Sequence, residues 1–176
     1  WRALAQLIAY SMPVVMALTA TVMRAESMFL TDIVESQQGL WNILYQPVGF
    51  ILFYISTLAI TFLPPFNLPV AKGELAGGVW ADLTGARKLL FRLGRLTLVF
   101  TISAAVVVLY LGGWMGPWLP DFAWTFLKTL LVAASFFAIG RFMPRIRHDH
   151  LLEYNWKYGV PLALYNIFQV GVVLLL

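Results

Sequence analysis

The sequence contains no cysteine, and only 11% of its 176 residues are charged. The absence of cysteine excludes disulfides, thiolate metal sites, iron–sulfur ligation and a cysteine nucleophile. Any redox centre that works with this chain must therefore lie in a partner. Soluble domains have about 25% charged residues. The low charge, together with 61% hydrophobic residues and a mean hydropathy of +0.81, predicts an integral membrane protein.

Histidine is almost as scarce, and the sequence shows no constellation typical of a soluble enzyme. The two histidines, His148 and His150, flank Asp149 in a basic loop. A metal site is conceivable there, but three adjacent residues of unknown geometry support it weakly, and a solvated loop is the preferred interpretation. No glycine-rich loop carries the Lys-Ser or Lys-Thr pair that phosphate binding requires. We therefore predict no metal site, no nucleotide chemistry and no catalytic residue in this chain.

Positive charge exceeds negative charge by four, and the isoelectric point is near 9.6. Nucleic acid is one partner that a basic protein can bind, but these cations cluster at the ends of apolar runs. That distribution follows the positive-inside rule for membrane proteins. The lipid bilayer, rather than nucleic acid, is the predicted partner.

Apolar runs divide the chain into membrane-spanning helices, each of which needs about 20 residues to cross a hydrocarbon core. We predict an all-α polytopic membrane protein with a single membrane domain over residues 1–176. Its five spans are residues 3–23, 40–63, 96–111, 122–142 and 158–176. Residues 64–95 form the loop between the second and third spans. Because Pro64, Pro65 and Pro69 restrict its backbone, this loop is predicted to be structured.

The cations are distributed unevenly between the two sides that five spans define. Only Arg24 and Lys128 fall on the side of the first loop. Ten fall on the side of the central loop: Arg2, Lys72, Arg87, Lys88, Arg92, Arg95, Arg141, Arg145, Arg147 and Lys157. The excess predicts that the loop 64–95 is cytoplasmic. Its last cations recur at helical spacing beside leucines, which indicates a basic amphipathic segment at the membrane surface.

Two residues inside the apolar runs call for an explanation. Pro13 has no N–H to donate, so it is expected to kink the first span and to free a carbonyl near Ala9. Lys128 lies within the fourth span. Its ammonium either extends to the nearby interface or forms an internal ionisable group, and the sequence does not separate these alternatives.

Several motifs, in one order and with plausible spacing, resemble one known family. They are AQLIAYSMP, LPPFNLPVAKGEL, TGARKLLF, YLGGW, LKTLL and MPRIRHDHL. The second is similar to the signature loop of the H-type membrane subunit of respiratory complex I, mitochondrial subunit one. The resemblance runs from Ala5 to about Asn166 and covers roughly the second half of the family's pattern. The first half is expected either as a separate chain or as a part that this sequence does not include.

The resemblance implies a subunit that lines a quinone chamber, docks the peripheral arm and begins a path of buried carboxylates for ion pumping. Quinone would be the substrate, with no covalently bound cofactor, and the chain would not be catalytic alone. Its partners would be the other membrane and peripheral subunits of a complex I-like assembly. The membrane would be that of a bacterial or archaeal cell, or an organellar inner membrane. Matching positions are Phe66, Pro69, Glu74, Asp82 and Arg87 in the chamber loop, Arg145, Arg147 and Asp149 in the second cytoplasmic loop, and Lys128 within the membrane.

Departures from the family pattern affect the carboxylate path. Where the family usually has acids, this chain has Ser11, Ile60, Asn67, Val70, Lys72 and Arg95. Isoleucine and valine cannot exchange protons, and arginine and lysine reverse the charge. We therefore predict impaired or rerouted coupling. Two alternative functions remain open at this stage: a subunit of a related membrane-bound hydrogenase or ferredoxin-linked complex, and a non-catalytic membrane anchor.

Overall fold

The computed structural model describes residues 2–67, 83–116, 120–144, 146 and 148–175. The regular elements in these ranges are all helices, so the predicted all-α class is confirmed. The helices are α1 (Arg2–Ala25), α2 (Leu30–Glu35), α3 (Asn42–Tyr45), α4 (Pro47–Ile60), α5 (Gly85–Tyr110), α6 (Asp121–Phe142), α7 (His148–Tyr154), the π-helix η2 (Asn155–Gly159) and α8 (Val160–Leu175).

Four helical stretches in the described parts are long and apolar enough to cross a membrane. They are Ala3–Ala25, Gly85–Tyr110, Asp121–Phe142 and His150–Leu175, while Pro47–Ile60 is apolar but shorter. The chain is therefore a polytopic membrane protein, as its composition predicts. The helix of the last stretch continues through α7, η2 and α8 without a loop between them.

The helices depart from the predicted spans in two places. Residues 40–63 do not form one helix, because Gln46 leaves the helical conformation (φ −134°, ψ 70°) and separates α3 from α4. Pro47 then opens α4, at a position where its missing N–H would have no partner in any case. Further along, α5 begins at Gly85, so the last part of the loop predicted over 64–95 is helical.

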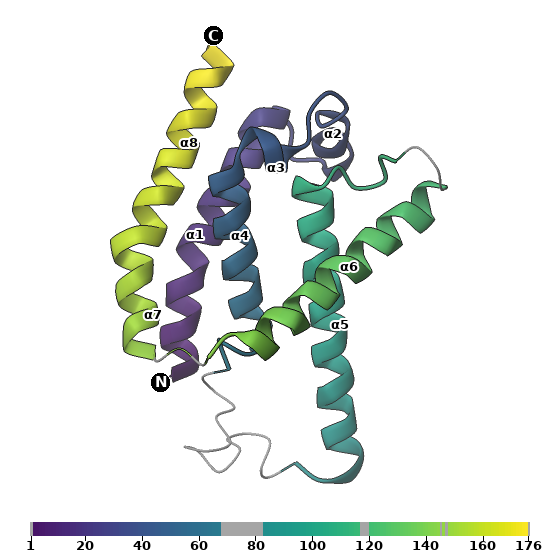
Figure 1. Ribbon diagram of the computed structural model, residues 1–176, viewed down its shortest axis with the longest axis vertical. Helices are drawn as coiled ribbons and strands as arrows, with labels where there is room; N and C mark the ends of the chain where they lie inside the picture. Colours follow the sequence, from purple (N-terminus) through teal and green to yellow (C-terminus); the bar gives the residue numbers. More distant parts are fainter. Residues whose placement is uncertain (1, 68–82, 117–119, 145, 147, 176) are drawn as a thin grey trace.

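Figure 1 shows how the helices are arranged. Helices α1, α4 and α8 run side by side, and α6 crosses α5 on the other side of the bundle. At one end, α2 and α3 lie beside the last turn of α5; we call this the α2–α3 end. At the opposite end lie the beginnings of α1 and α7 and the chain that leaves α4; we call this the loop end. The first turns of α5 extend past the other helices there.

Aromatic rings join α4, α5 and α6 in the core. Tyr110 is fully buried, with ring centroids 5.6 Å from Phe50 and 5.4 Å from Phe53. Tyr54 packs against Phe136 at 4.8 Å. Such aromatic pairs stabilise a fold beyond the area that they bury. This core fixes the position of α4, whose end begins the candidate site.

Candidate functional site

The segment Thr61–Asn67 leads from α4 into the central loop, and we call it the loop anchor. Thr61 is fully buried, Leu63 is 7% exposed and Phe66 is 5% exposed. A connecting segment is normally exposed, because its backbone groups must find partners. The burial of this one indicates that other parts of the chain supply those partners.

Gln6 of α1 is the first of these partners. Its side chain is fully buried, and its Nε2 donates hydrogen bonds to the carbonyl of Ala59 at 2.8 Å and to that of Phe66 at 2.9 Å. One amide group thus joins the last turn of α4 to the end of the loop anchor. Because these partners are 53 and 60 positions away in the sequence, α1 determines where the loop starts in space.

Arg95 of α5 supplies the second connection. Its Nε donates to the carbonyl of Thr61 at 3.3 Å, and its Nη2 donates to that of Phe62. These carbonyls lie at the C-terminal end of α4, where unpaired acceptors and the helix dipole both favour a cation. The family resemblance predicts an acid at this position, and the positive charge of Arg95 has favourable electrostatic partners in these two carbonyls.

The end of α6 and the segment after it make the third connection. The backbone N–H of Ile146 donates to the carbonyl of Pro65 at 3.3 Å. Gly140 lies so close to the anchor that a Cβ at this position would be 2.7 Å from the carbonyl oxygen of Pro64. A side chain at residue 140 would therefore displace the anchor. Helices α1, α5 and α6 together hold this segment.

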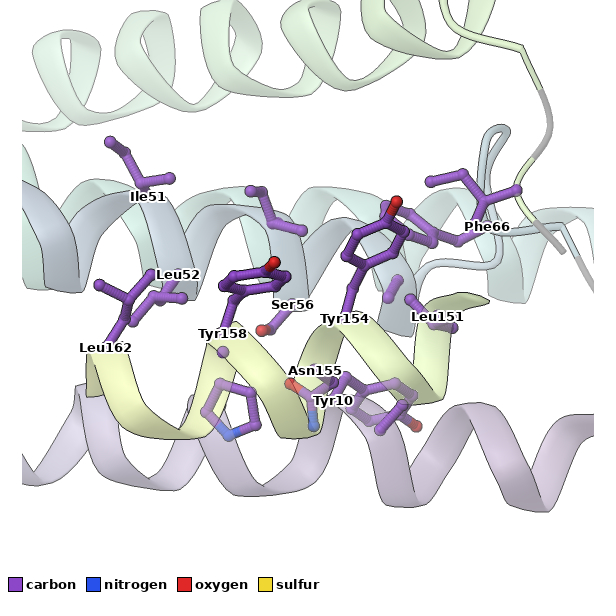
Figure 2. Close-up of a pocket in the computed structure, with 16 residues that line it drawn as sticks. Tyr10, Ile51, Leu52, Ser56, Phe66, Leu151, Tyr154, Asn155, Tyr158 and Leu162 are labelled. Carbon is purple, nitrogen blue, oxygen red and sulfur yellow. The ribbon is translucent and has the colours of Figure 1, made fainter. Parts of the chain in front are cut away.

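A cavity lies on each side of the loop anchor. The first has a volume of about 360 Å³ and lies between α1, α4 and the continuous helix α7–η2–α8, with Phe66 at its loop end (Figure 2). We call it the α1–α4–α8 cavity. The second, of about 370 Å³, is lined by Leu63, Pro64, Phe136, Phe137, Gly140 and Arg141. Apolar space is therefore available on both sides of the anchor.

The predicted chamber residues are only partly placed. Phe66 is buried in the loop anchor, and Arg87 is exposed on the first turn of α5. Pro69, Glu74, Asp82, Arg145 and Arg147 lie outside the described residues. Asp149 falls within α7, but its side chain is outside the description. Phe66 and Arg87 therefore stay candidates on the sequence argument.

Lys128 lies at the other end of the bundle, and the structure favours the internal alternative. The side chain is 9% exposed, and its Nζ donates to the carbonyls of Leu111 at 2.7 Å, Gly113 at 3.2 Å and Met115 at 2.9 Å. The ammonium also lies 4.6 Å from the ring centroid of Trp41. All three N–H donors of the ammonium therefore bind carbonyl oxygens of the segment that follows α5.

Gln37, which no sequence motif singled out, reinforces the same turn. Its Nε2 donates to the carbonyls of Ile33 and Val108, each at 3.0 Å. Its Oε1 accepts from the N–H of Gly112 at 3.0 Å and from that of Asn42 at 3.3 Å. The only sequence signal was a polar residue in a short loop, which usually means a solvated side chain.

Asn42 and Arg24 complete this network. The Nδ2 of Asn42 donates to the carbonyl of Leu109 at 2.7 Å, and its Oδ1 accepts from Arg24. Arg24 also donates to the carbonyl of Leu40 at 3.0 Å and stacks 4.2 Å from the ring centroid of Tyr45. Like Lys128 and Arg95, Arg24 binds carbonyl oxygens near the ends of helices.

Metal ligands do not gather in the described part of the chain, where no group of three or more His, Asp or Glu side chains is found. Ser11, at one of the positions where the family usually has an acid, donates within its own helix to the carbonyl of Ile8 at 3.2 Å. The described residues therefore provide hydrogen-bonding groups, positive charges and mostly apolar cavities. These features suit the binding of a ligand or a partner.

A family model described as NADH dehydrogenase matches residues 1–171. The chain belongs to this family. A relative from Geobacter metallireducens, an H-type subunit of NADH-quinone oxidoreductase, is 42% identical over 175 residues, which cover 99% of this chain and 53% of that protein. A second H-type relative, from Rhodopseudomonas palustris, is 41% identical over 172 residues, or 98% of this chain and 54% of that protein. The chain thus spans about half the length of these curated relatives.

A solved structure shows the same fold. It is that of the membrane-bound sulfane sulfur reductase, an archaeal respiratory membrane complex, to one chain of which this fold is similar with a TM-score of 0.85. The match covers 96% of this chain and 58% of that chain, at 23% sequence identity. At this identity the similarity establishes the arrangement of helices. The resemblance to the H-type family is confirmed by the NADH dehydrogenase family match and the relatives.

Proposed function

We propose that this chain is part of the membrane subunit of a complex I-like NADH:quinone oxidoreductase, where it lines the quinone chamber and docks the peripheral arm. Membership of the NADH dehydrogenase family carries the proposal, since relatives about 40% identical are H-type subunits of NADH-quinone oxidoreductases. The chain contains no cysteine and so supplies no iron–sulfur ligand. Electron transfer would take place in partner subunits, and this chain would hold the quinone for them.

The loop anchor supports this role. A chamber between membrane and peripheral subunits needs a loop that starts from a fixed position, because a small displacement of binding groups weakens their action. Gln6 provides that fixed position through buried hydrogen bonds, and Arg95 through partly buried ones. Pro69, Glu74 and Asp82, which follow the anchor in the sequence, are proposed to face the quinone.

Docking of a partner would use the first turns of α5. Arg87, Lys88 and Arg92 are exposed there, together with Leu89 and Leu90 at 59% and 67% exposure. This part of α5 extends beyond the rest of the bundle at the loop end (Figure 1). A surface with both charge and apolar area suits a protein interface.

Ion pumping through this chain in the family's usual form is not part of the proposal. Helices α1, α4, α5 and α8 contain no aspartate or glutamate, and α6 has only Asp121 in its first turn. Lys128 and Arg95 bind backbone carbonyls at helix ends. A proton path would therefore need water or acids from neighbouring subunits.

The substitution Glu74→Gln tests the proposed chamber, because it removes a charge while keeping the shape of the side chain. Loss of one charge-assisted hydrogen bond corresponds to about a tenfold to hundredfold decrease in quinone reductase activity. We expect this decrease in a complex that is still fully assembled, and we expect no change for Glu153→Gln, whose side chain is exposed on α7. Failure of assembly would instead mean that Glu74 holds the loop through a salt bridge.

The partners distinguish the proposed function from its alternatives. Native mass spectrometry of the purified complex should reveal soluble subunits that bind NADH. Hydrogenase-type or ferredoxin-linked subunits in their place would contradict the proposal. A complex that contains soluble redox subunits but in which this chain neither binds quinone nor conducts ions would favour a non-catalytic anchor.

A further inference from the structure

The α1–α4–α8 cavity contains a buried polar group that lacks a partner. Asn155 is 9% exposed, lines the cavity, and its Nδ2 has no hydrogen-bond acceptor among the described residues. A buried amide N–H without an acceptor destabilises a fold, because it has lost its hydrogen bonds to water. Asn155 begins the π-helix η2, and π-helical turns occur often at functional sites. The unpaired donor therefore indicates a missing acceptor inside this cavity.

The backbone next to Asn155 leaves room for the side chain of this residue. A Cβ at Gly159 would lie 2.5 Å from the Oδ1 of Asn155, so glycine leaves the room that this side chain occupies. Figure 2 shows Asn155 between η2 and α1, and Tyr10 of α1 lines the same cavity. The donor is thus held in place by the helix that carries it.

The remaining lining is mostly apolar and elongated. From Phe66 and Leu151 at the loop end, the cavity continues along the helices to aliphatic side chains that lie further from that end. These include Ile51, Leu52 and Leu162, and Ile55 also lines the cavity. A water molecule could pair with Asn155, but it would leave most of the cavity of about 360 Å³ empty. The lining matches a molecule with a long apolar part and one hydrogen-bond acceptor.

The rim of the cavity has the composition of a membrane interface. Tyr154 and Tyr158 are 60% and 50% exposed, line the cavity, and stack with their ring centroids 6.0 Å apart. Tyrosine is enriched where the polar headgroups of lipids meet their acyl chains. The ester groups of a phospholipid lie at that depth, immediately above the acyl chains.

We propose that the α1–α4–α8 cavity binds one acyl chain of a membrane phospholipid, whose ester carbonyl accepts a hydrogen bond from Nδ2 of Asn155. The acyl chain occupies the aliphatic part near Leu52 and Leu162, and the ester lies beside Asn155. This lipid is a bound component of the protein, distinct from the quinone, so its presence does not depend on the proposed enzymatic function.

The test uses the whole purified complex in nanodiscs that contain a phosphatidylcholine with a photoactivatable diazirine on one acyl chain. Irradiation should label residues around Ile55 and Leu162, as mapped by mass spectrometry of peptides. Ile55→Trp, which narrows the cavity, should decrease this labelling and the amount of phospholipid retained in native mass spectrometry. Leu164→Trp is the matched control, because Leu164 is 54% exposed on α8 and does not line the cavity.

Asn155→Leu tests the hydrogen bond separately, because it keeps the size of the side chain and removes the donor. Loss of one such bond should weaken lipid retention roughly fivefold while leaving the labelled positions unchanged. Equal labelling in wild type and Ile55→Trp would overturn the proposal. So would a wild-type complex that shows no labelling of the cavity, whether water or another part of the protein fills it. Unchanged retention in Asn155→Leu would disprove the ester contact.

Discussion

The C-terminal ends of α4 and α5 lie at opposite ends of the bundle, and their unpaired carbonyl groups are bound by similar side chains. Each leaves carbonyl groups without helical donors, and each receives a cation and an amide side chain from distant parts of the chain. Arg95 and Gln6 serve α4, whereas Lys128 and Gln37, with Asn42, serve α5.

The two ends differ in what surrounds them. At α5, Lys128 uses three protons and Gln37 makes four hydrogen bonds. At α4, the Oε1 of Gln6 has no partner among the described residues, and cavities of about 360 and 370 Å³ lie beside the anchor. Dense networks make one arrangement unique, whereas cavities allow binding and adjustment. The α2–α3 end is thus held by the denser hydrogen-bond network, whereas the loop end leaves a buried polar atom without a described partner beside mostly apolar space.

The largest expected effect is in chemical labelling, because the loop end and the α2–α3 end are predicted to lie on opposite sides of the membrane. The chain has no cysteine, so a single introduced thiol gives an unambiguous signal. In membranes stripped of peripheral subunits, Lys88→Cys should react only with a membrane-impermeant reagent added from the cytoplasmic side, and Gly39→Cys only with one added from outside. Both positions are exposed, and a Cβ at Gly39 meets nothing within 4 Å. Labelling of both from one side would show that the ends are not opposed.

A smaller effect is expected when Lys128 loses its charge. Lys128→Met keeps the apolar stem but leaves the carbonyls of Leu111, Gly113 and Met115 without this donor. We expect a decrease in stability of about 3 kcal/mol, measured as a lower unfolding temperature of the purified protein in detergent. Lys88→Met is the matched control and should change little, because Lys88 is exposed. Equal effects at the two lysines would refute the fixing role of Lys128.

The smallest expected effect is a difference in stability between two variants that carry the same change, glutamine to leucine, at opposite ends of the bundle. Gln37→Leu breaks four hydrogen bonds, and Gln6→Leu breaks two. Because a typical bond contributes about 1 kcal/mol, the first variant should be less stable than the second by about 2 kcal/mol. Thermal unfolding of both variants under the same conditions measures the difference. A larger loss for Gln6→Leu would reverse the comparison between the ends.

Hydropathy predicted most of the fold, because the requirement to cross a bilayer is visible along the chain itself. It missed the break before Pro47, although a proline at that position is a clear signal for a helix start. It also could not report where α5 begins, although the helical spacing of the cations after Gly85 indicates an amphipathic segment there. The turns from Gly85 to Leu96 are polar enough to lie outside an apolar layer, and hydropathy does not report helices there.

The candidate site was less accessible to sequence reasoning. Phe66 and Lys128 could be selected, the first from the loop motif and the second as a charge in an apolar run. The roles of Gln6 and Arg95 could not, because their hydrogen bonds reach backbone groups 33 to 60 positions away. A backbone carbonyl has no sequence signature, so only the fold reveals which side chain it binds. Gln6 did carry one signal, since a lone amide within an apolar span usually faces the bundle interior.

Helix α5 is uninterrupted from Gly85 to Tyr110, and its 26 residues give a length of about 39 Å. Its middle is tied to α4 through Arg95, and the turn beyond its last residue is tied to α6 through Lys128. The helix is thus held at two places, and its first turns extend past the other helices. A partner that displaces the exposed first turns would therefore also move Arg95, whose hydrogen bonds to Thr61 and Phe62 connect α5 directly to the loop anchor.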